Sequence, residues 1–95
     1  MAAYVIVDNE ITDQALFADY AREILALTEA HGGRYLVRGG ATEVVEGNWT
    51  PHRVVIIEFE DIEQARSLVS DPNYVRLAEL RGRSSVTSTV IVEGV

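Results

Sequence analysis

The sequence of 95 residues contains no cysteine and no lysine, so all eight of its basic residues are arginine. Without cysteine, the chain can form no disulfide framework, iron–sulfur cluster or thiolate zinc site, and it has no thiol nucleophile. Without lysine, it cannot form a Schiff base with a carbonyl substrate. The reactive groups that remain are histidine, tyrosine, arginine and the carboxylates.

Basic charge and long apolar runs are also scarce. Fifteen acidic residues against eight basic ones give a formal net charge of −7, which disfavours binding to a nucleic-acid backbone. No apolar run approaches the roughly 20 residues of a membrane-spanning helix, and the N-terminus lacks the basic region of a signal peptide. We therefore expect a cytoplasmic protein without a nucleic-acid or membrane partner.

The pattern along the chain predicts one domain, residues 1–95, in which strands and helices alternate. Strands are expected at about 4–11, 34–38, 53–59 and 86–93, and a bend at Gly39-Gly40 allows the second strand to continue over 42–46. Helices are expected at about 13–31, from Asp61 onward, and from Pro72 to about Gly82. This βαββαβ order predicts an α+β, ferredoxin-like fold, with a four-stranded antiparallel sheet and helices on one face.

Two strands have apolar residues on both faces, although a sheet with one solvated face should alternate between apolar and polar residues. We assign Val55, Ile57 and Phe59 to the face that the helices cover. The other face then carries a large apolar patch, formed by Tyr4, Ile6, Leu36, Val54, Ile56 and Ile91. A second copy packed sheet against sheet would cover this patch, so we expect a homodimer.

Four charged residues, Asp8, Arg38, Glu58 and Glu93, are expected near the strand ends of the same open face. They have two interpretations. In one, they form a solvated rim that sets the register of the dimer. In the other, they line a polar pocket in which Arg38 binds an anionic ligand through its planar guanidinium, unless Glu58 or Asp8 already neutralises it.

The candidate catalytic residue is His31. Helical spacing places it with Tyr20 and Leu27 on the side facing the sheet, where a histidine can act as acid or base. Alternatively, it is a favourable cationic group in the last turn of a helix. Tyr20 and Tyr74 either shape a pocket or pack in the core, and Trp49 is either a lid or an anchor of the dimer.

Motifs for metals and cofactors are missing. His31 and His52 do not have the spacing of a metal site, and Gly39-Gly40 lacks the strand–loop–helix context of a phosphate-binding loop. No nucleophile elbow or dinucleotide fingerprint is visible. We therefore expect no metal and no cofactor.

Several segments resemble a known family over essentially the whole chain. They are Ala3-Tyr4-Val5-Ile6-Val7, Ala30 to Gly40 (AHGGRYLVRGG), Ile57-Glu58-Phe59, Ser70-Asp71-Pro72-Asn73-Tyr74 and Val92-Glu93-Gly94-Val95. In this order they resemble the small bacterial domain-of-unknown-function family 1330. The resemblance implies a ferredoxin-like fold of the dimeric α+β barrel superfamily, usually a homodimer, and it brings no established reaction.

Two hypotheses about function follow. In the first hypothesis, the chain is a cofactor-independent enzyme that acts on a small aromatic or carboxylated metabolite. His31 would then be the acid or base and Arg38 the anion anchor, and the ligand would be surrounded by Tyr20, Trp49, Tyr74 and Glu58. In the second hypothesis, the chain is a non-catalytic small-molecule-binding or dimeric assembly module, in which these polar side chains are structural.

Overall fold

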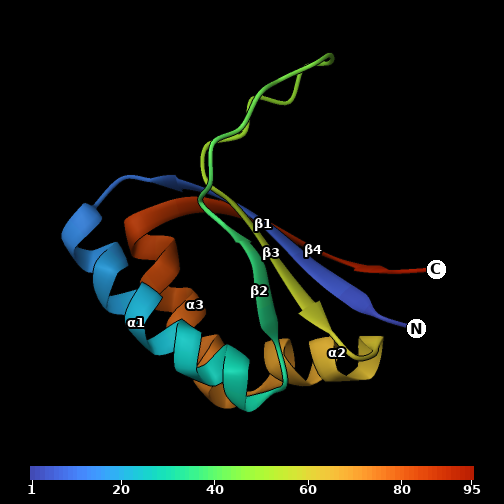
Figure 1. The fold of residues 1–95 in the computed structure, drawn as a ribbon. Helices are drawn as coiled ribbons and strands as arrows, with labels where there is room; N and C mark the ends of the chain where they lie inside the picture. Colours follow the sequence, from blue (N-terminus) through green and yellow to red (C-terminus); the bar gives the residue numbers. More distant parts are fainter.

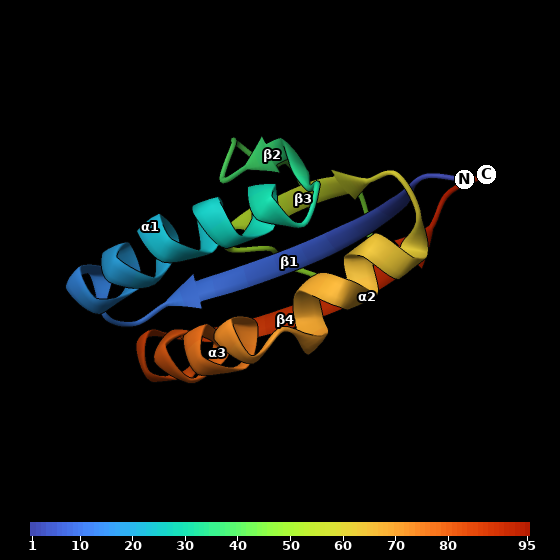
Figure 2. The same cartoon turned by 90° about the horizontal axis from the view of Figure 1, so that it is seen from below.

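A computed structural model describes all residues, 1–95. Its strands are β1 (Ala3–Ile11), β2 (Arg34–Arg38), β3 (Val54–Phe59) and β4 (Ser85–Glu93), and its helices are α1 (Gln14–Ala30), α2 (Ile62–Ser70) and α3 (Pro72–Ser84). The strands form one antiparallel sheet in the order β2-β3-β1-β4. All three helices cover the same face of this sheet (Figures 1 and 2). The predicted α+β, ferredoxin-like fold is confirmed.

Aspartates begin all three helices. Asp13 accepts from the Leu16 amide at 3.1 Å, Asp61 from the Gln64 amide at 2.9 Å, and Asp71 from the Asn73 amide at 2.8 Å. Each bond satisfies an amide that has no partner inside its helix. These caps therefore fix where the helices start, and with them the position of every helical side chain over the sheet.

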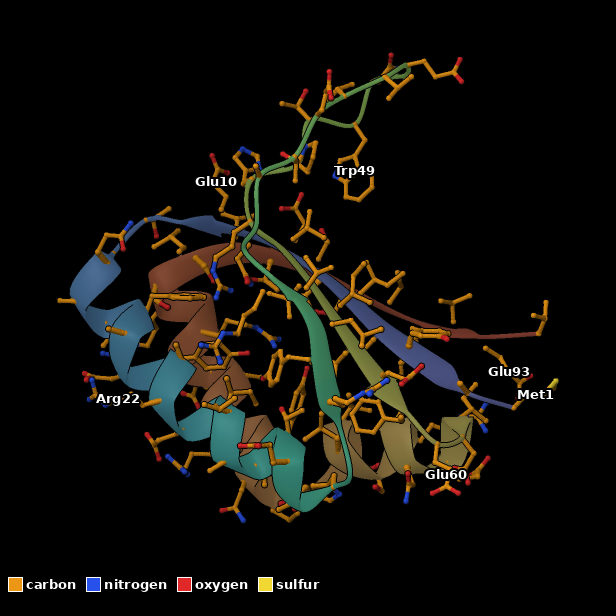
Figure 3. The ribbon with its side chains drawn as sticks, viewed as in Figure 1. Met1, Glu10, Arg22, Trp49, Glu60 and Glu93 are labelled. Atoms are coloured by element: carbon orange, nitrogen blue, oxygen red, sulfur yellow. The ribbon has the colours of Figure 1, made fainter.

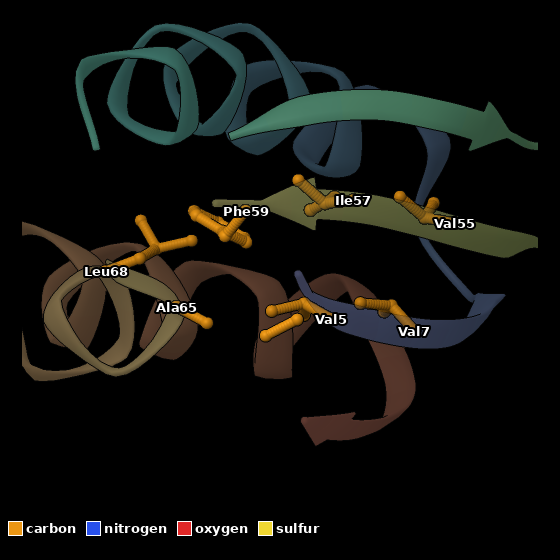
Figure 4. Packing of buried hydrophobic residues seen from close by; sticks show 8 residues of the cluster. Val5, Val7, Val55, Ile57, Phe59, Ala65 and Leu68 are labelled. Atoms are coloured by element: carbon orange, nitrogen blue, oxygen red, sulfur yellow. The ribbon is translucent and has the colours of Figure 1, made fainter. Parts of the chain in front are cut away.

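The core lies between the helices and the sheet. Val5 and Val7 from β1 and Ile57 and Phe59 from β3 are at most 9% exposed and form one apolar cluster with Leu68 of α2. Figure 4 shows these side chains along the two strands and on α2, with Leu68 beside Phe59. The predicted helix-facing side of β3 is therefore confirmed.

The segment 39–53 differs from the prediction. Residues 42–46 form no strand, and the whole segment between β2 and β3 lacks regular structure. It projects from the sheet on the side away from the helices (Figure 1), and we call it the arm. Asp8 holds its base, accepting from the His52 amide at 2.9 Å and from the Arg53 amide at 3.1 Å.

The open face of the sheet has the predicted apolar character but not all of the predicted residues. Ile91 was placed there wrongly, because it pairs with Val5, packs against the core and faces the helices. Its neighbours Val90 and Val92 lie on the open face instead and are 56% and 46% exposed. Glu93 was also misplaced, because it pairs with Ala3, which the helices bury.

Arg38 was expected on the open face as well, and this was wrong. A β-bulge between Tyr35 and Val37 shifts the register, so Arg38 pairs with Val55 of the helix-facing side. Residues that pair directly across two strands share a face. The bulge therefore turns Arg38 toward the helices, where it reaches the cavity described below.

Candidate functional site

A cavity of about 250 Å³ lies between the helices and the sheet. Its apolar walls come from the strands and from α1, and include Val5, Val7, Phe17, Val55 and Ile57. Ligand pockets commonly have volumes from about 300 to 1,000 Å³. The cavity lies just below the lower end of this range, so it has room for a small metabolite and none for a dinucleotide.

Two arginines reach the cavity from the sheet. Arg53, just before β3, donates to Asn9 Oδ1 at 3.2 Å, and its guanidinium lies 5.4 Å from the ring centre of Phe17. Arg38 lies 5.5 Å from the ring centre of Tyr35. Neither guanidinium has a carboxylate within ion-pair distance, whereas Arg34, Arg66 and Arg76 each pair with a glutamate.

A third arginine, Arg81 of α3, reaches the cavity from the opposite side. Its Nη1 donates to the Tyr74 hydroxyl at 3.1 Å and to the Tyr20 hydroxyl at 3.4 Å. The guanidinium also lies 5.6 Å and 5.8 Å from the centres of these two rings. Arg81 likewise has no carboxylate partner, so these two tyrosines are the groups that hold it in place.

Burial shifts the pKa of several groups around the cavity. Burial lowers the pKa of Arg53, and the nearby charge of Arg38 lowers this pKa further. Burial raises the pKa of Tyr20, although the hydrogen bond and charge of Arg81 oppose this shift. Although burial alone would lower the pKa of Arg81, the hydrogen bonds to Tyr74 and Tyr20 raise it. Arg81 therefore stays cationic and Tyr20 stays a neutral phenol at neutral pH.

The charged residues of the lining are all arginines. Four of the chain's eight arginines line the cavity, and only Arg22 among them has an acidic partner, Asp19. No aspartate, glutamate or histidine is among the lining residues. In a chain of net charge −7, three guanidinium groups without a carboxylate partner lie beside apolar walls, an arrangement whose chemistry suits a small organic anion.

His31 lies outside this lining. It follows the last residue of α1, and its ring nitrogens lie 2.9 Å from Ser67 Oγ and 2.8 Å from Asp71 Oδ2. The Ser67 hydroxyl itself donates to the Gln64 carbonyl, so it is not a free nucleophile. The side chain of His31 thus links the end of α1 to the junction of α2 and α3.

Trp49 and Glu58 also lie away from the cavity. Trp49 is on the arm, 59% exposed, and donates from Nε1 to Asp8 Oδ2 at 3.0 Å (Figure 3). Glu58 pairs with Arg34 and accepts from the Tyr4 hydroxyl at 3.3 Å, so it does not neutralise Arg38. Of the six predicted site residues, the structure brings together Tyr20, Arg38 and Tyr74.

Three cavity residues, Asn9, Arg53 and Arg81, were not predicted. The sequence contained a signal for each of them. Asn9 continues the alternation of Val5 and Val7, and Arg53 continues that of Val55 and Ile57, so both fall on the helix-facing side. Arg81 follows Tyr74 by seven residues, which places both on one face of a helix.

Comparison with known proteins settles the family. The model of the domain of unknown function DUF1330 matches residues 2–95. The chain belongs to the DUF1330 family. This confirms the resemblance found in the sequence, and it assigns no reaction. A search of curated proteins found no match to this chain.

Solved structures share the fold of this DUF1330 protein at low sequence identity. RPA0582, of unknown function from Rhodopseudomonas palustris, is 15% identical with a TM-score of 0.77, over 99% of this chain and 82% of that one. SnoaB, a cofactor-independent oxygenase from Streptomyces nogalater, is 12% identical with a TM-score of 0.69, over 99% and 93%. A dimeric ferredoxin-like protein of unknown function from Jannaschia sp. CCS1 is 15% identical with a TM-score of 0.64, over 99% and 100%. These similarities establish the fold alone.

Two further features concern ligands and membranes. No three side chains of the metal-binding types histidine, aspartate and glutamate gather at one point. None of the three helices combines the length and hydropathy that a transmembrane segment requires.

Proposed function

We propose that this DUF1330 protein is a cofactor-independent enzyme that binds a small aromatic carboxylate in the cavity between the helices and the sheet. The observation that carries the proposal is the set of three guanidinium groups without carboxylate partners beside apolar walls. The ring of the ligand contacts the walls, and its carboxylate binds Arg38 and Arg53. SnoaB, a cofactor-independent oxygenase, provides an analogy of fold for this class of enzyme.

Arg53 is the better positioned of the two anchoring arginines. Its bond to Asn9 Oδ1 fixes the guanidinium, and Asn9 in turn donates to Thr87 Oγ1 at 2.8 Å. Asn9 is 2% exposed, so the middle residue of this chain of hydrogen bonds is buried. A donor held in place before the ligand arrives loses little entropy on binding.

The binding test compares two ligands of the same shape and different charge. Isothermal titration calorimetry with benzoate and its neutral analogue benzamide measures how much the charge contributes. Charge-assisted hydrogen bonds contribute about 1.5–3 kcal/mol, so Arg38→Gln and Arg53→Gln should each weaken benzoate binding about tenfold or more. Benzamide should bind the native protein more weakly than benzoate does.

Arg83→Gln is the matched control, because Arg83 is exposed, has no ion-pair partner and does not line the cavity. It removes the same charge and should leave the affinity for benzoate unchanged. Equal affinities for benzoate and benzamide, or an equal loss in all three variants, would contradict the proposal.

A non-catalytic binding module is the second candidate, and one observation favours it. His31 is engaged by Ser67 and Asp71, and the cavity lining contains no histidine or carboxylate to act as a base. Recovery of aromatic carboxylates unchanged after long incubation with the protein in air would support this candidate. Conversion that Arg53→Gln slows at low ligand concentration and Arg83→Gln retains would support the enzyme.

We further propose that the protein acts as a homodimer joined through the open face of the sheet. Exposed Val86, Val90 and Val92 and partly buried Ile6 and Ile56 leave this face apolar. The ferredoxin-like protein from Jannaschia, which shares the fold, is dimeric. The arm rises on this same side, so Trp49 is in a position to contact a second copy (Figure 3).

A further inference from the structure

The cluster of Tyr20, Tyr74 and Arg81 has an unusual hydrogen-bond arrangement. Both tyrosine hydroxyls accept a hydrogen bond from the same atom, Arg81 Nη1. A hydroxyl has one proton to donate as well as lone pairs that accept. Neither Tyr20 nor Tyr74 has an acceptor within the protein for its own proton, and both residues line the cavity.

Tyr35 shows the contrasting arrangement in the same cavity. Its hydroxyl donates to Thr28 Oγ1 at 3.3 Å, and Thr28 is fully buried. The proton of Tyr35 is therefore already used inside the protein. Tyr20 and Tyr74 differ from it because their protons remain for a ligand.

Arg81 strengthens both tyrosines as donors. A hydroxyl that accepts from a cation becomes a stronger donor itself, because the two hydrogen bonds polarise one another in surroundings of low dielectric constant. Tyr20 is only 7% exposed, and burial raises the pKa of its hydroxyl, so it keeps its proton. The Arg81 guanidinium thus polarises two neutral O–H donors, one from α1 and one from α3.

We infer that Tyr20, Tyr74 and Arg81 form an oxyanion site, which binds a ligand oxygen as its negative charge develops. The oxygen would be that of a phenolate or an enolate. Fixed donors aimed at a developing charge need no reorganisation when the charge forms, and this makes such sites effective. The inference rests on the proposed function, since it concerns the same cavity and the same ligand.

The oxyanion site restricts the class of ligand that the cavity can bind. The cavity has one group of donors at Arg38 and Arg53 and a second at Arg81 and its tyrosines. An aromatic carboxylate with a hydroxyl on the ring can engage both groups, with its carboxylate on the first and its phenolic oxygen on the second. We therefore assign hydroxybenzoate-like molecules as the ligand class.

The test uses 4-hydroxy-3-nitrobenzoate, because its phenolate absorbs visible light and its phenol does not. Titrating the bound probe with base measures the pKa of the phenol in the cavity. The native protein should lower this pKa relative to the free probe, although its net charge of −7 alone would raise it. Tyr20→Phe and Tyr74→Phe should each reduce the preference for phenolate over phenol about tenfold.

Tyr35→Phe is the matched control. It removes a hydroxyl from the same cavity and should leave the phenol pKa of the bound probe at the native value. Tyr74 is only partly buried, so Tyr74→Phe keeps the test decisive should Tyr20→Phe fail to fold. Circular dichroism verifies the fold of each variant before titration.

The possible outcomes separate this inference from the proposed function. A probe that binds with an unshifted phenol pKa, or with equal effects of all three Phe variants, overturns the oxyanion site and leaves the binding cavity in place. A native protein that binds neither this probe nor benzoate overturns both. A lowered phenol pKa that Tyr20→Phe and Tyr74→Phe reverse, and Tyr35→Phe does not, establishes the site.

Discussion

The packing around Gly33 leaves no room for a side chain. A Cβ at this position would lie 2.6 Å from Thr28 Cγ2, 2.9 Å from Phe59 Cζ and 3.0 Å from Ile57 Cγ2. Its neighbour Gly32 is needed for a different reason, a φ of +82° that allows the chain to leave α1. The two adjacent glycines therefore bring β2 against the core.

Gly33→Ala should destabilise the protein by about 1–3 kcal/mol, which is the usual cost of overpacking a core. Urea unfolding followed by circular dichroism measures the change in the free energy of unfolding. Gly40→Ala is the control, because a Cβ at Gly40 meets nothing within 4 Å. Equal stabilities of the two variants would contradict the packing argument.

At the scale of single residues, the sequence predicted some cavity residues and missed others. Tyr20 and Tyr74 were candidates because large aromatics at helical spacing reach either a core or a pocket. Arg53 and Arg81 were missed because arginine side chains are mostly solvent-exposed, so an arginine in a sequence is first assigned to the surface. What distinguishes them is the absence of a carboxylate partner in space, and no spacing rule shows that.

At the scale of elements, His31 and Asp71 connect all three helices. Asp71 is the last residue before α3 and also follows the end of α2, and its carboxylate lies 2.8 Å from the His31 ring at the end of α1. The hydrogen bond from His31 holds the pKa of Asp71 below its ordinary value of 3.8, and the bond from the Asn73 amide lowers it further.

This shift predicts how stability depends on pH. Because the folded state lowers the pKa of Asp71, its ionised form stabilises the fold above the unfolded-state pKa, and this stabilisation is lost as pH falls through the folded-state value. Asp71→Asn, which keeps a capping oxygen, should therefore destabilise the protein more at about pH 5 than at about pH 3. Urea unfolding at the two pH values measures the difference.

Asp61→Asn is the control for this prediction, because Asp61 caps α2 through the Gln64 amide and has no histidine partner. It separates the change of capping group from the loss of the contact with His31. A destabilisation by Asp71→Asn that is the same at both pH values would refute the coupling.

The order of the elements was predictable because each helix start has a local signal, an aspartate followed by an apolar pattern. For some strand residues, however, the sequence did not predict which face of the sheet the side chain lies on. The bulge between Tyr35 and Val37 turns Arg38 toward the helices, and it arises from pairing with β3, which lies distant in sequence. Ile91 was misassigned because Val90, Ile91 and Val92 are all apolar, so alternation could not distinguish the faces of β4.

At the scale of the whole molecule, the helices bury one face of the sheet and leave the other apolar face open. Val90→Arg should convert the proposed dimer into a monomer, because it places a charge on that face. Light scattering coupled to size-exclusion chromatography measures the mass of each variant. Val75→Arg is the matched control, since Val75 is 61% exposed on α3, away from the open face.

We expect Val90→Arg to have about half the native mass and Val75→Arg to have the native mass. A native protein that is monomeric at all concentrations, or a Val90→Arg variant that remains dimeric, would rule out the open face as the interface. Neither result would affect the proposed role of the cavity, because the cavity lies on the opposite face of the sheet.

The proposed function requires that the unpaired arginines of the cavity bind an organic anion. The most direct measurement is a titration of the ¹⁵N-labelled protein with benzoate, following the side-chain Nε–H signals of its arginines by NMR. We expect the signals of Arg38 and Arg53 to shift and to saturate together, while those of Arg66, Arg76 and Arg83 stay in place. Shifts of equal size at all arginines, or none at Arg38 and Arg53, would contradict it.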